Sequence, residues 1–274
     1  MLKYYPKYMW RFIGWVFGSG LLLMIIAMLP GNDSNDGIWG TAAFAVMLLA
    51  AVMVRNSVAT NYNQQIAILN DACRPAEYIA NNEKAFARAQ RRSQKGNGEY
   101  AAWRIQLDYS VALYADGRYD AAIGVMKKLL EGGISLPTRL AAYDRLANYF
   151  CARNEEGDLD KAREYLSKAK QLVAECRESG KTDGLRGVAD LIYIEYCIEA
   201  KADEPSDGTL EYFEKLTEAV LFRRGELSAR YHLAEIYEKR GDAAASREQL
   251  RIVAERGAEL EIGRRAAAKI ADKE

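Results

Sequence analysis

Two uninterrupted apolar runs occupy most of the first 55 residues of this chain. Phe12–Leu29 and Ile38–Val54 contain no charged residue, and each is close to the length of about 17–25 residues that crosses a bilayer core as a helix. The segment between them, Pro30–Gly37, consists of residues that break helices and start turns. The pair predicts a transmembrane hairpin over residues 1–55, with spans at 12–29 and 38–54. The alternative for the first run is a cleaved signal peptide, but a second span that follows so soon would anchor the chain again.

The charges that flank the two runs predict the orientation of the hairpin. Lys3, Lys7 and Arg11 precede the first run and Arg55 follows the second, whereas the turn between the runs has no Lys or Arg. An excess of Lys and Arg marks the cytoplasmic side of a span. We therefore expect a two-span protein of the cell membrane, with both termini in the cytoplasm.

Composition limits the remaining 220 or so residues. Lys plus Arg and Asp plus Glu both number 38, so no strong field indicates nucleic acid as a partner. The four cysteines show neither a CxxC pair nor metal-like spacing, which is typical of reduced, partly buried thiols (Cys73, Cys151, Cys176, Cys197). With only five prolines and an excess of Ala, Leu, Glu, Lys and Arg, the chain favours helix almost throughout.

A connector over residues 56–98 follows the second run. Arg55–Asn70 contains no Gly or Pro and can continue the membrane helix as a semi-rigid stalk. Pro75 then breaks the chain before an expected helix at Ala76–Arg92. The basic end of that helix either contacts anionic lipid headgroups or is a solvated terminus whose cations suit the helix dipole, and the second interpretation is favoured.

A helix-turn-helix signature recurs from about residue 99 to residue 272. In three segments a helix runs into a Gly, a small residue stands five positions later, and apolar residues follow that residue at four and seven positions. The three sets are Gly117, Ala122, Met126 and Leu129; Gly157, Ala162, Leu166 and Ala169; and Gly241, Ser246, Leu250 and Val253. Gly can end a helix in a left-handed cap, and the small residue lets two helices approach closely.

This pattern resembles the tetratricopeptide repeat (TPR) family over roughly residues 99–274. The resemblance implies an all-α fold, an α-solenoid of helix-turn-helix repeats, after the membrane hairpin. The second repeat has a longer turn, and Leu185–Ala200 with Thr209–Val220 forms a helical pair without the diagnostic Gly and Ala. Glu259–Ala271 is expected to be a capping helix. A generic helical bundle is the alternative fold.

No catalytic constellation is evident. His232 is the single histidine, and the HEXXH, GXXXXGK[ST] and GXSXG motifs are absent. The acidic segment Asn154–Asp160 lacks the alternating oxygen ligands and closing Glu of a calcium loop, so turn and cap residues explain it better. We expect no enzymatic activity, no metal site and no bound cofactor.

The TPR resemblance implies that first helices of the repeats form a concave face that binds a protein or peptide. Projecting the repeat positions onto this chain gives the following candidate partner-binding residues: Arg104, Leu107, Val111, Tyr114, Asp144, Asn148, Tyr231, His232 and Glu235. The Lys/Asn set with which some family members hold a C-terminal carboxylate is not reproduced, because only Asn148 stands at a matching place and Asp144 stands where a Lys is needed. For any single one of these residues, core packing or solvation is the simpler interpretation.

Two functions follow as hypotheses. The first is a membrane-anchored scaffold or adaptor that faces the cytoplasm and mediates protein–protein interaction at the inner face of the bilayer. The alternative is an accessory subunit of a membrane enzyme or transporter that docks through its hairpin. Gly14 and Gly18 form a GxxxG in the first run, which serves either packing within the hairpin or a homo-oligomer through the membrane helices.

Overall fold

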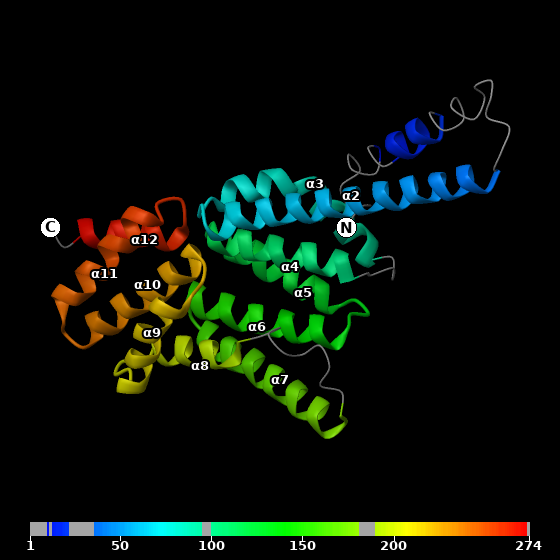
Figure 1. Ribbon diagram of the computed structural model, residues 1–274. Coiled ribbons are helices and arrows are strands. Elements are labelled where there is room, and N and C mark those ends of the chain that lie inside the picture. The colour runs from blue at the N-terminus through cyan, green and yellow to red at the C-terminus, as the bar shows by residue number, and fades with distance from the viewer. Residues whose placement is uncertain (1–9, 11–12, 22–35, 95–99, 181–189, 273–274) are drawn as a thin grey trace. The chain divides into compact units, whose positions relative to one another are not determined.

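The regular structure of the described residues is entirely α-helical. The computed structural model describes residues 10, 13–21, 36–94, 100–180 and 190–272 (Figure 1). These residues fall into two compact units, Met1–Gln65 and Ile66–Glu274. This division lies within one helix, so it does not test the predicted limits at residues 55 and 98.

The first unit contains a helical segment at 13–21 and the greater part of α2 (Asp36–Asn70). Helix α2 runs through Arg55 without a break for 35 residues, which confirms that residues 56–70 continue the second apolar run as a helix. Among the described residues one helical stretch, Phe44–Asn70, is long and apolar enough to cross a membrane, with a mean hydropathy of 1.4. Half of the first predicted span, residue 12 and residues 22–29, and most of the turn after it lie outside the described residues. The two-span hairpin therefore stays a prediction.

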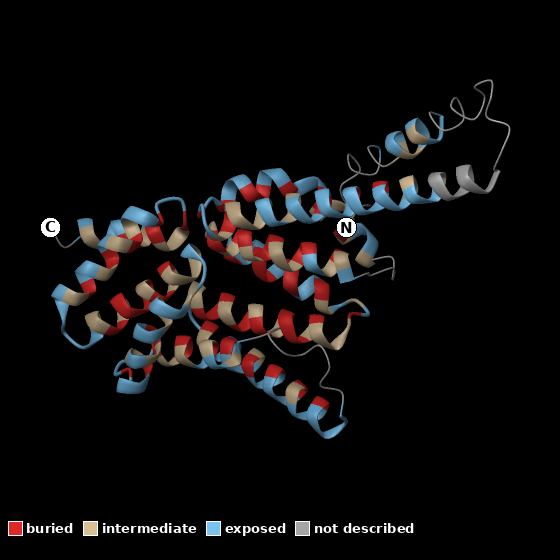
Figure 2. Cartoon of the chain, in the orientation of Figure 1, coloured by how far each residue is buried: buried red, intermediate tan, exposed pale blue. Residues whose placement is uncertain are grey.

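The second unit is a series of antiparallel helix pairs in which each helix packs against the next along the chain (Figure 1). The helices are α3 (Pro75–Gln94), α4 (Tyr100–Ala115), α5 (Tyr119–Leu130), α6 (Leu136–Arg153), α7 (Asp158–Glu178), α8 (Leu191–Glu199), α9 (Asp207–Ala219), α10 (Arg223–Lys239), α11 (Ala243–Arg256) and α12 (Glu261–Ala271). The sequence predicts this order, including the pair without diagnostic Gly and Ala, which is α8 and α9. Residues that are buried lie on the facing sides of the helices, and exposed residues lie on the outer sides (Figure 2).

The recurring signature has the physical role that its spacing predicts. Gly117, Gly157 and Gly241 all have a positive φ, between 74° and 83°. The small residues five positions later are at most 1% exposed, and the apolar residues after them are at most 8% exposed (Ala122, Ala162, Ser246; Met126, Leu129, Leu166, Ala169, Leu250, Val253). The close helix contact and the filled core between helices are therefore confirmed.

The longer turn of the second repeat departs from the predicted cap. Helix α6 ends at Asn154, which takes the left-handed conformation at φ 55°, and Gly157 instead precedes the first residue of α7. Arg153 makes two hydrogen bonds of 2.8 Å with the fully buried carboxylate of Asp158 across this turn. The acidic segment is thus a turn held by a bidentate ion pair, as expected for capping residues rather than a calcium loop.

The C-terminal helix α12 packs against α11 and is also hydrogen-bonded to the turn of the first repeat and to the end of α6 in the second. Arg264 Nη2 donates to the carbonyl of Asp116 at 2.8 Å, and Arg265 Nη1 donates to the carbonyl of Ala152 at 3.3 Å. The larger hydrophobic cluster of the described residues runs from Leu69 to Ala266, and a smaller one joins α6 to α7 (Leu140, Ala169, Leu172 and Cys176). The sequence predicts a solenoid with a cap, whereas in the structure the cap also closes the end of the unit onto its beginning.

Replacing Gly117 with Ala should lower the free energy of unfolding by about 1–2 kcal/mol, because an L-residue is strained at this φ of +83°. The new Cβ would also lie 2.7 Å from Glu261 Oε2, which must move aside. Gly124→Ala is the matched control, since that position is exposed within α5 and its Cβ would meet nothing within 4 Å. The control should be neutral or stabilising in urea titrations followed by circular dichroism. Equal effects of the two changes would contradict this account.

Candidate functional site

One cavity of about 380 Å³ lies between the first helices of successive pairs and is called the inner pocket below. Helices α4, α6, α8 and α10 contribute most of its walls, and the turn from α9 to α10 forms its rim. The lining residues are Val111, Tyr114, Arg145, Asn148, Tyr149, Asp190, Tyr193, Leu216, Val220, Leu221, Phe222, Arg224, Gly225 and Ser228. Its size is in the range of ligand pockets, about 300–1,000 Å³.

Arg145 is a cation of the inner pocket whose charge is already balanced. Its Nη1 lies 2.5 Å from Asp144 Oδ2, and Asp144 is only 2% exposed. The other oxygen of Asp144 accepts the backbone N–H of Asp190 at 3.1 Å, which attaches the start of α8 to α6. Arg145 Nε is buried and has no hydrogen-bond partner among the described residues.

Arg224 is the other cation of the inner pocket, and no described carboxylate pairs with it. Its Nε donates to Asn70 Oδ1 at 3.1 Å, and its guanidinium lies 5.5 Å from the ring centroid of Phe222. Burial lowers the pKa of Arg224, and nearby Arg145 lowers it further, although the tyrosine side chains around it act in the opposite direction. An arginine nevertheless remains charged in proteins, so this side chain places in the pocket a positive charge that forms no described ion pair, although the carboxylate of Asp190 also lines the pocket.

Three tyrosines line the inner pocket with rings and hydroxyls. Tyr114 stacks on Tyr149 with ring centroids 4.9 Å apart, and Tyr149 Oη lies 2.9 Å from Ser110 Oγ. Tyr193 Oη lies 3.1 Å from Ser228 Oγ, which connects α8 to α10. Burial raises the pKa of Tyr114 and of Tyr193 well above the ordinary value, so these phenols stay neutral and can donate hydrogen bonds.

The rim of the inner pocket exposes large apolar side chains. Leu221 is 98% exposed and Phe222 is 37% exposed, and both belong to the short turn between α9 and α10. Single exposed apolar residues are common on protein surfaces. Here, however, the two residues flank a cavity that contains an unbalanced cation.

The structure brings three of the predicted partner-binding residues together in this cavity, namely Val111, Tyr114 and Asn148. Asp144 lies behind the pocket wall, where it pairs with Arg145. The other two predicted residues of α4 do not line it: Arg104 pairs with Asp108 at 3.2 Å, and Leu107 packs against the core.

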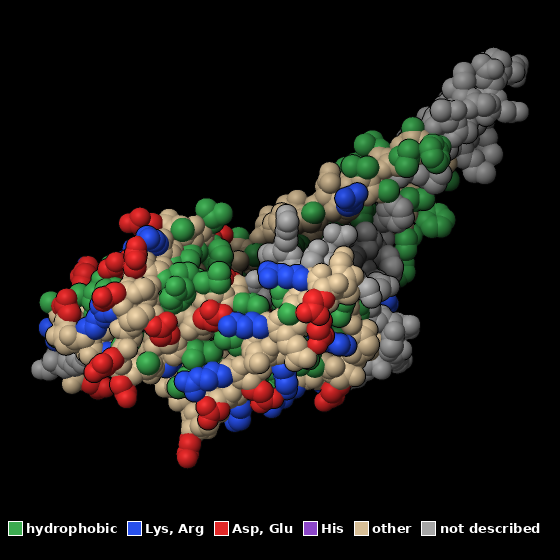
Figure 3. All heavy atoms as spheres, turned by 90° about the horizontal axis from the view of Figure 1, so that it is seen from below, with side chains coloured by type: hydrophobic (Ala, Val, Ile, Leu, Met, Phe, Trp, Pro, Cys, Tyr) green, Lys and Arg blue, Asp and Glu red, His purple; other side chains and the backbone are tan. Residues whose placement is uncertain are grey.

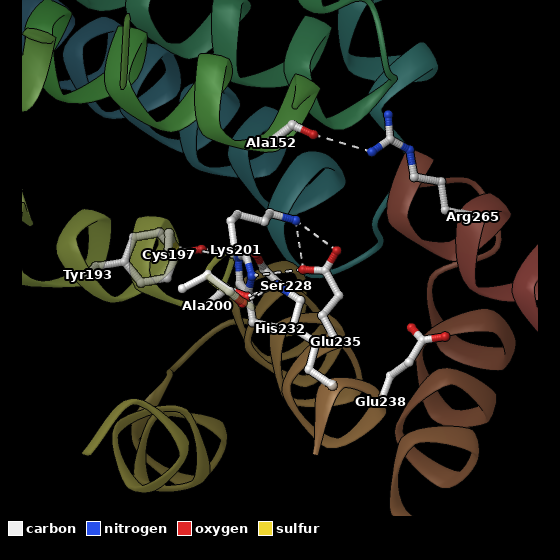
Figure 4. A network of polar contacts seen from close by, with 12 residues as sticks. Ala152, Tyr193, Cys197, Ala200, Lys201, Ser228, His232, Glu235, Glu238 and Arg265 are labelled. Carbon is white, nitrogen blue, oxygen red and sulfur yellow. Dashed lines mark hydrogen bonds and ion pairs between the residues drawn. The ribbon is translucent and has the colours of Figure 1, made fainter. Parts of the chain in front are cut away.

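Two of the three predicted residues of α10, His232 and Glu235, belong to a second, largely buried cluster (Figure 4), whereas Tyr231 packs in the hydrophobic core. Tyr231 and His232 are each 7% exposed. Glu235 accepts two hydrogen bonds from Lys201 Nζ, at 2.7 and 2.8 Å, and its Oε2 lies 3.5 Å from His232 Nδ1. His232 Nε2 lies 3.5 Å from Cys197 Sγ, so the cluster joins α8 to α10.

In this second cluster Cys197, His232 and Glu235 follow one another as a nucleophile, a base and an orienting acid do in a catalytic triad. A substrate cannot reach them, however. Cys197 is 1% exposed, and burial raises the pKa of its thiol well above the ordinary value. A catalytic thiol needs access and a lowered pKa. The arrangement therefore supports packing of α8 on α10 rather than catalysis, and all four cysteines are buried and free of disulfides.

Acid should weaken the folded state through Glu235. Burial raises the pKa of this carboxyl, but the adjacent His232 and Lys201 lower it more strongly, to about 2 from an ordinary 4.5. The stabilisation is then complete above about pH 4.5 and is lost as the pH falls toward 2. Urea titrations should show a loss on the order of 3 kcal/mol from this group over that interval.

Glu235→Gln should flatten that part of the pH profile and destabilise the protein at neutral pH, because it leaves Lys201 buried without a counter-charge. Glu255→Gln is the matched control, since that carboxylate is exposed and its ion pair is with exposed Arg251. An unchanged pH profile in Glu235→Gln would show that His232 and Lys201 do not lower the pKa of this carboxyl.

Arg145, Tyr193, Phe222 and Arg224 line the inner pocket but are not among the predicted residues. The sequence contained a signal that could have placed Arg145 in the pocket. Arg145 precedes Asn148 by three residues and Tyr149 by four, so the three side chains share one face of the helix. Arg224 and Phe222 flank the start of α10, and their position depends on how the α9–α10 turn packs.

Comparison with known proteins gives no match: no protein-family model, no curated protein and no solved structure matches this chain. The stacked antiparallel helix pairs are thus observed in the structure, whereas membership of the TPR family is not shown.

Proposed function

We propose that this chain is a membrane-anchored helical-repeat protein that binds a protein partner at the cytoplasmic face of the membrane. The observation that carries the proposal is the combination, in one chain, of an apolar helix with exposed side chains and a unit of stacked helix pairs. The finer elements of the proposal are the two-span hairpin, with spans at 12–29 and 38–54, and the TPR-like character of the repeats.

The exposed side of α2 supports a bilayer as its environment. Phe44, Leu48, Leu49, Val52 and Met53 are between 47% and 61% exposed. Full burial of one such side chain contributes roughly 1.5–3 kcal/mol, so leaving five of them in water is costly. A lipid bilayer removes this cost without a specific partner.

The second unit supports the binding of a protein rather than of nucleic acid. Stacked helix pairs present extended surfaces that other proteins use for binding. On the face in Figure 3, side chains of both signs are interspersed, with hydrophobic side chains between them. This agrees with a net charge of zero for the whole chain, whereas a nucleic-acid site needs a positive field.

Gly14 and Gly18 favour the alternative function, an accessory subunit that docks through its membrane helices. A Cβ added at either position would meet no described atom within 4 Å. A small-residue surface of this kind suits a helix of another membrane protein, or of a second copy of this chain.

Exchanging the membrane segment tests both functions. Residues 1–55 are replaced with an unrelated two-span anchor of the same orientation, and both chains are used to capture partners from detergent extract. The scaffold function predicts that the same partner is recovered by both chains, whereas the accessory-subunit function predicts that the exchanged chain loses it. Proximity labelling from the C-terminus provides the topology, and labelling of proteins from the outer face alone would contradict the proposed orientation.

A further inference from the structure

The unbalanced charge of Arg224 is the starting point for a ligand of the inner pocket. Arg224 is partly buried, and among the described residues it has only the amide oxygen of Asn70 and the ring of Phe222 as partners. Removing a charge from water is costly unless the charge is paired. The same pocket is lined by Arg145, whose buried Nε has no described partner. These donors point to an anion as the missing partner.

The other charges of the pocket indicate which anion fits. Arg145 is already neutralised by Asp144, and the carboxylate of Asp190, a lining residue, accepts the backbone N–H of Tyr193 at 3.0 Å. One unbalanced guanidinium beside a carboxylate suits a monoanion better than a phosphate dianion. A guanidinium binds a carboxylate through two parallel hydrogen bonds. The neutral hydroxyl of Tyr114 can donate a further one, whereas the hydroxyls of Tyr149 and Tyr193 lie beside Ser110 and Ser228.

The apolar rim of the inner pocket indicates which kind of molecule the carboxylate belongs to. Leu221 is 98% exposed, and a small acid inside the cavity would leave it in water. A peptide segment can place a carboxylate in the pocket while a neighbouring apolar side chain covers Leu221 and Phe222. Aromatic side chains and arginine are enriched at the centres of protein interfaces.

We infer that the inner pocket binds an internal Asp or Glu side chain of a partner peptide, with Arg224 paired to the carboxylate and the Leu221–Phe222 rim in contact with an adjacent large apolar residue. This inference rests on the proposed function, that the helical-repeat unit binds a protein.

Screening of peptides whose two ends are blocked tests the inference directly. The probe is a bead-bound library of short randomised peptides, acetylated and amidated, presented to the detergent-solubilised full chain. Selected peptides should share an acidic residue next to a large apolar one. Replacing that acid with its amide should weaken binding about ten-fold to a hundred-fold. Selection of peptides without an acid, or binding that requires a free C-terminus, would overturn the inference.

Variants of the protein connect the binding to the pocket. Arg224→Gln should reduce affinity for the selected peptide as much as the acid-to-amide change does, and the two changes together should cost little more than either alone. Arg223→Gln is the matched control, because this neighbouring arginine is exposed and does not line the pocket. Leu221→Ser should also weaken binding and, on an exposed turn, should leave the fold intact. Full affinity in both Arg224→Gln and Leu221→Ser would refute the pocket as the binding site.

The outcomes separate this inference from the proposed function. If the exchange experiment recovers a partner whose binding is insensitive to Arg224→Gln, the pocket inference fails and the protein-binding function stands. If neither the exchange experiment nor the peptide screen yields a bound protein or peptide, the proposed function fails as well.

Discussion

Replacing Gly263 with Ala should lower the free energy of unfolding by about 3 kcal/mol or more, the largest effect that we expect from a single methyl group in this protein. A Cβ at this position would lie 1.8 Å from the carbonyl oxygen of Gly257 and 2.4 Å from its carbon. Both contacts are with backbone, so no side chain can rotate to relieve them. Helix α12 must then move away from the turn that precedes it. This movement would break the hydrogen bonds from Arg264 to Asp116 and from Arg265 to Ala152.

The sign of this effect is informative, because Ala is the better helix former by about 1 kcal/mol. If α12 were only a weakly packed terminal helix, Gly263→Ala should stabilise it. Urea titrations and amide exchange of residues 261–271 distinguish the two cases. The matched control, Ala267→Gly, changes an exposed position of the same helix and should cost only about 1 kcal/mol. Greater stability of Gly263→Ala would refute the close contact with Gly257.

Two arginines in place of Leu49 and Val52 should prevent α2 from inserting into a membrane. Each arginine near the centre of a span costs about 2.5–3.5 kcal/mol, and the pair therefore outweighs what several large apolar residues contribute. Two properties define correct insertion: the chain resists extraction by carbonate, and its C-terminus lies on the cytoplasmic side. We expect the fraction of molecules with both properties to fall by more than about ten-fold. Protease access to a C-terminal tag in sealed vesicles measures the second property.

Asn56→Arg with Ala59→Arg is the control for this experiment, because it adds the same charge at the same spacing on exposed positions beyond Arg55. These arginines lie on the side predicted to be cytoplasmic, so membrane retention should be unchanged. Extraction of the unmodified chain by carbonate would contradict the membrane assignment of α2, and full retention of the Leu49 and Val52 variant would contradict α2 as the span.

The repeats were predictable because their determinants are local. Gly117, Ala122 and Met126 lie within one helix-turn-helix, and the spacing alone places the first in the turn and the other two on the inner side of the next helix. The longer second turn shows the limit of this reasoning. There Asn154 ends the helix in place of Gly157, because Asn also tolerates the left-handed conformation.

The candidate site was predictable only in part, because it depends on contacts between distant helices. Helical spacing places Val111, Tyr114 and Asn148 on the inner face of their helices, and they line the inner pocket. The same reasoning assigns Asp144 and His232 to a partner-binding surface. In the structure their side chains are 3% and 9% exposed, respectively, because Arg145 and Cys197 supply partners within the unit.

In the N-terminal 70 residues, too, the features that depend on local sequence were predictable. The apolar character of these residues and the flanking charges predict a membrane segment and its orientation without any tertiary contact, since burial in lipid depends on composition and length. The helical continuation of α2 to Asn70 followed from the absence of Gly and Pro, and the structure confirms it.

The sequence by itself determined the helical class, the order of the helix pairs and the apolar segments that precede them, because helix periodicity, caps and hydropathy act over short stretches of chain. Only the tertiary structure decided that α12 is hydrogen-bonded to the first two repeats and that Glu235 and Lys201 pair in the interior. It also decided that Arg224 lies beside Tyr114, Tyr149 and Tyr193 with no carboxylate of the described residues paired to it. These features join residues that are tens of positions apart. No local pattern encodes such pairs, because their proximity results from the packing of helices that the chain forms independently.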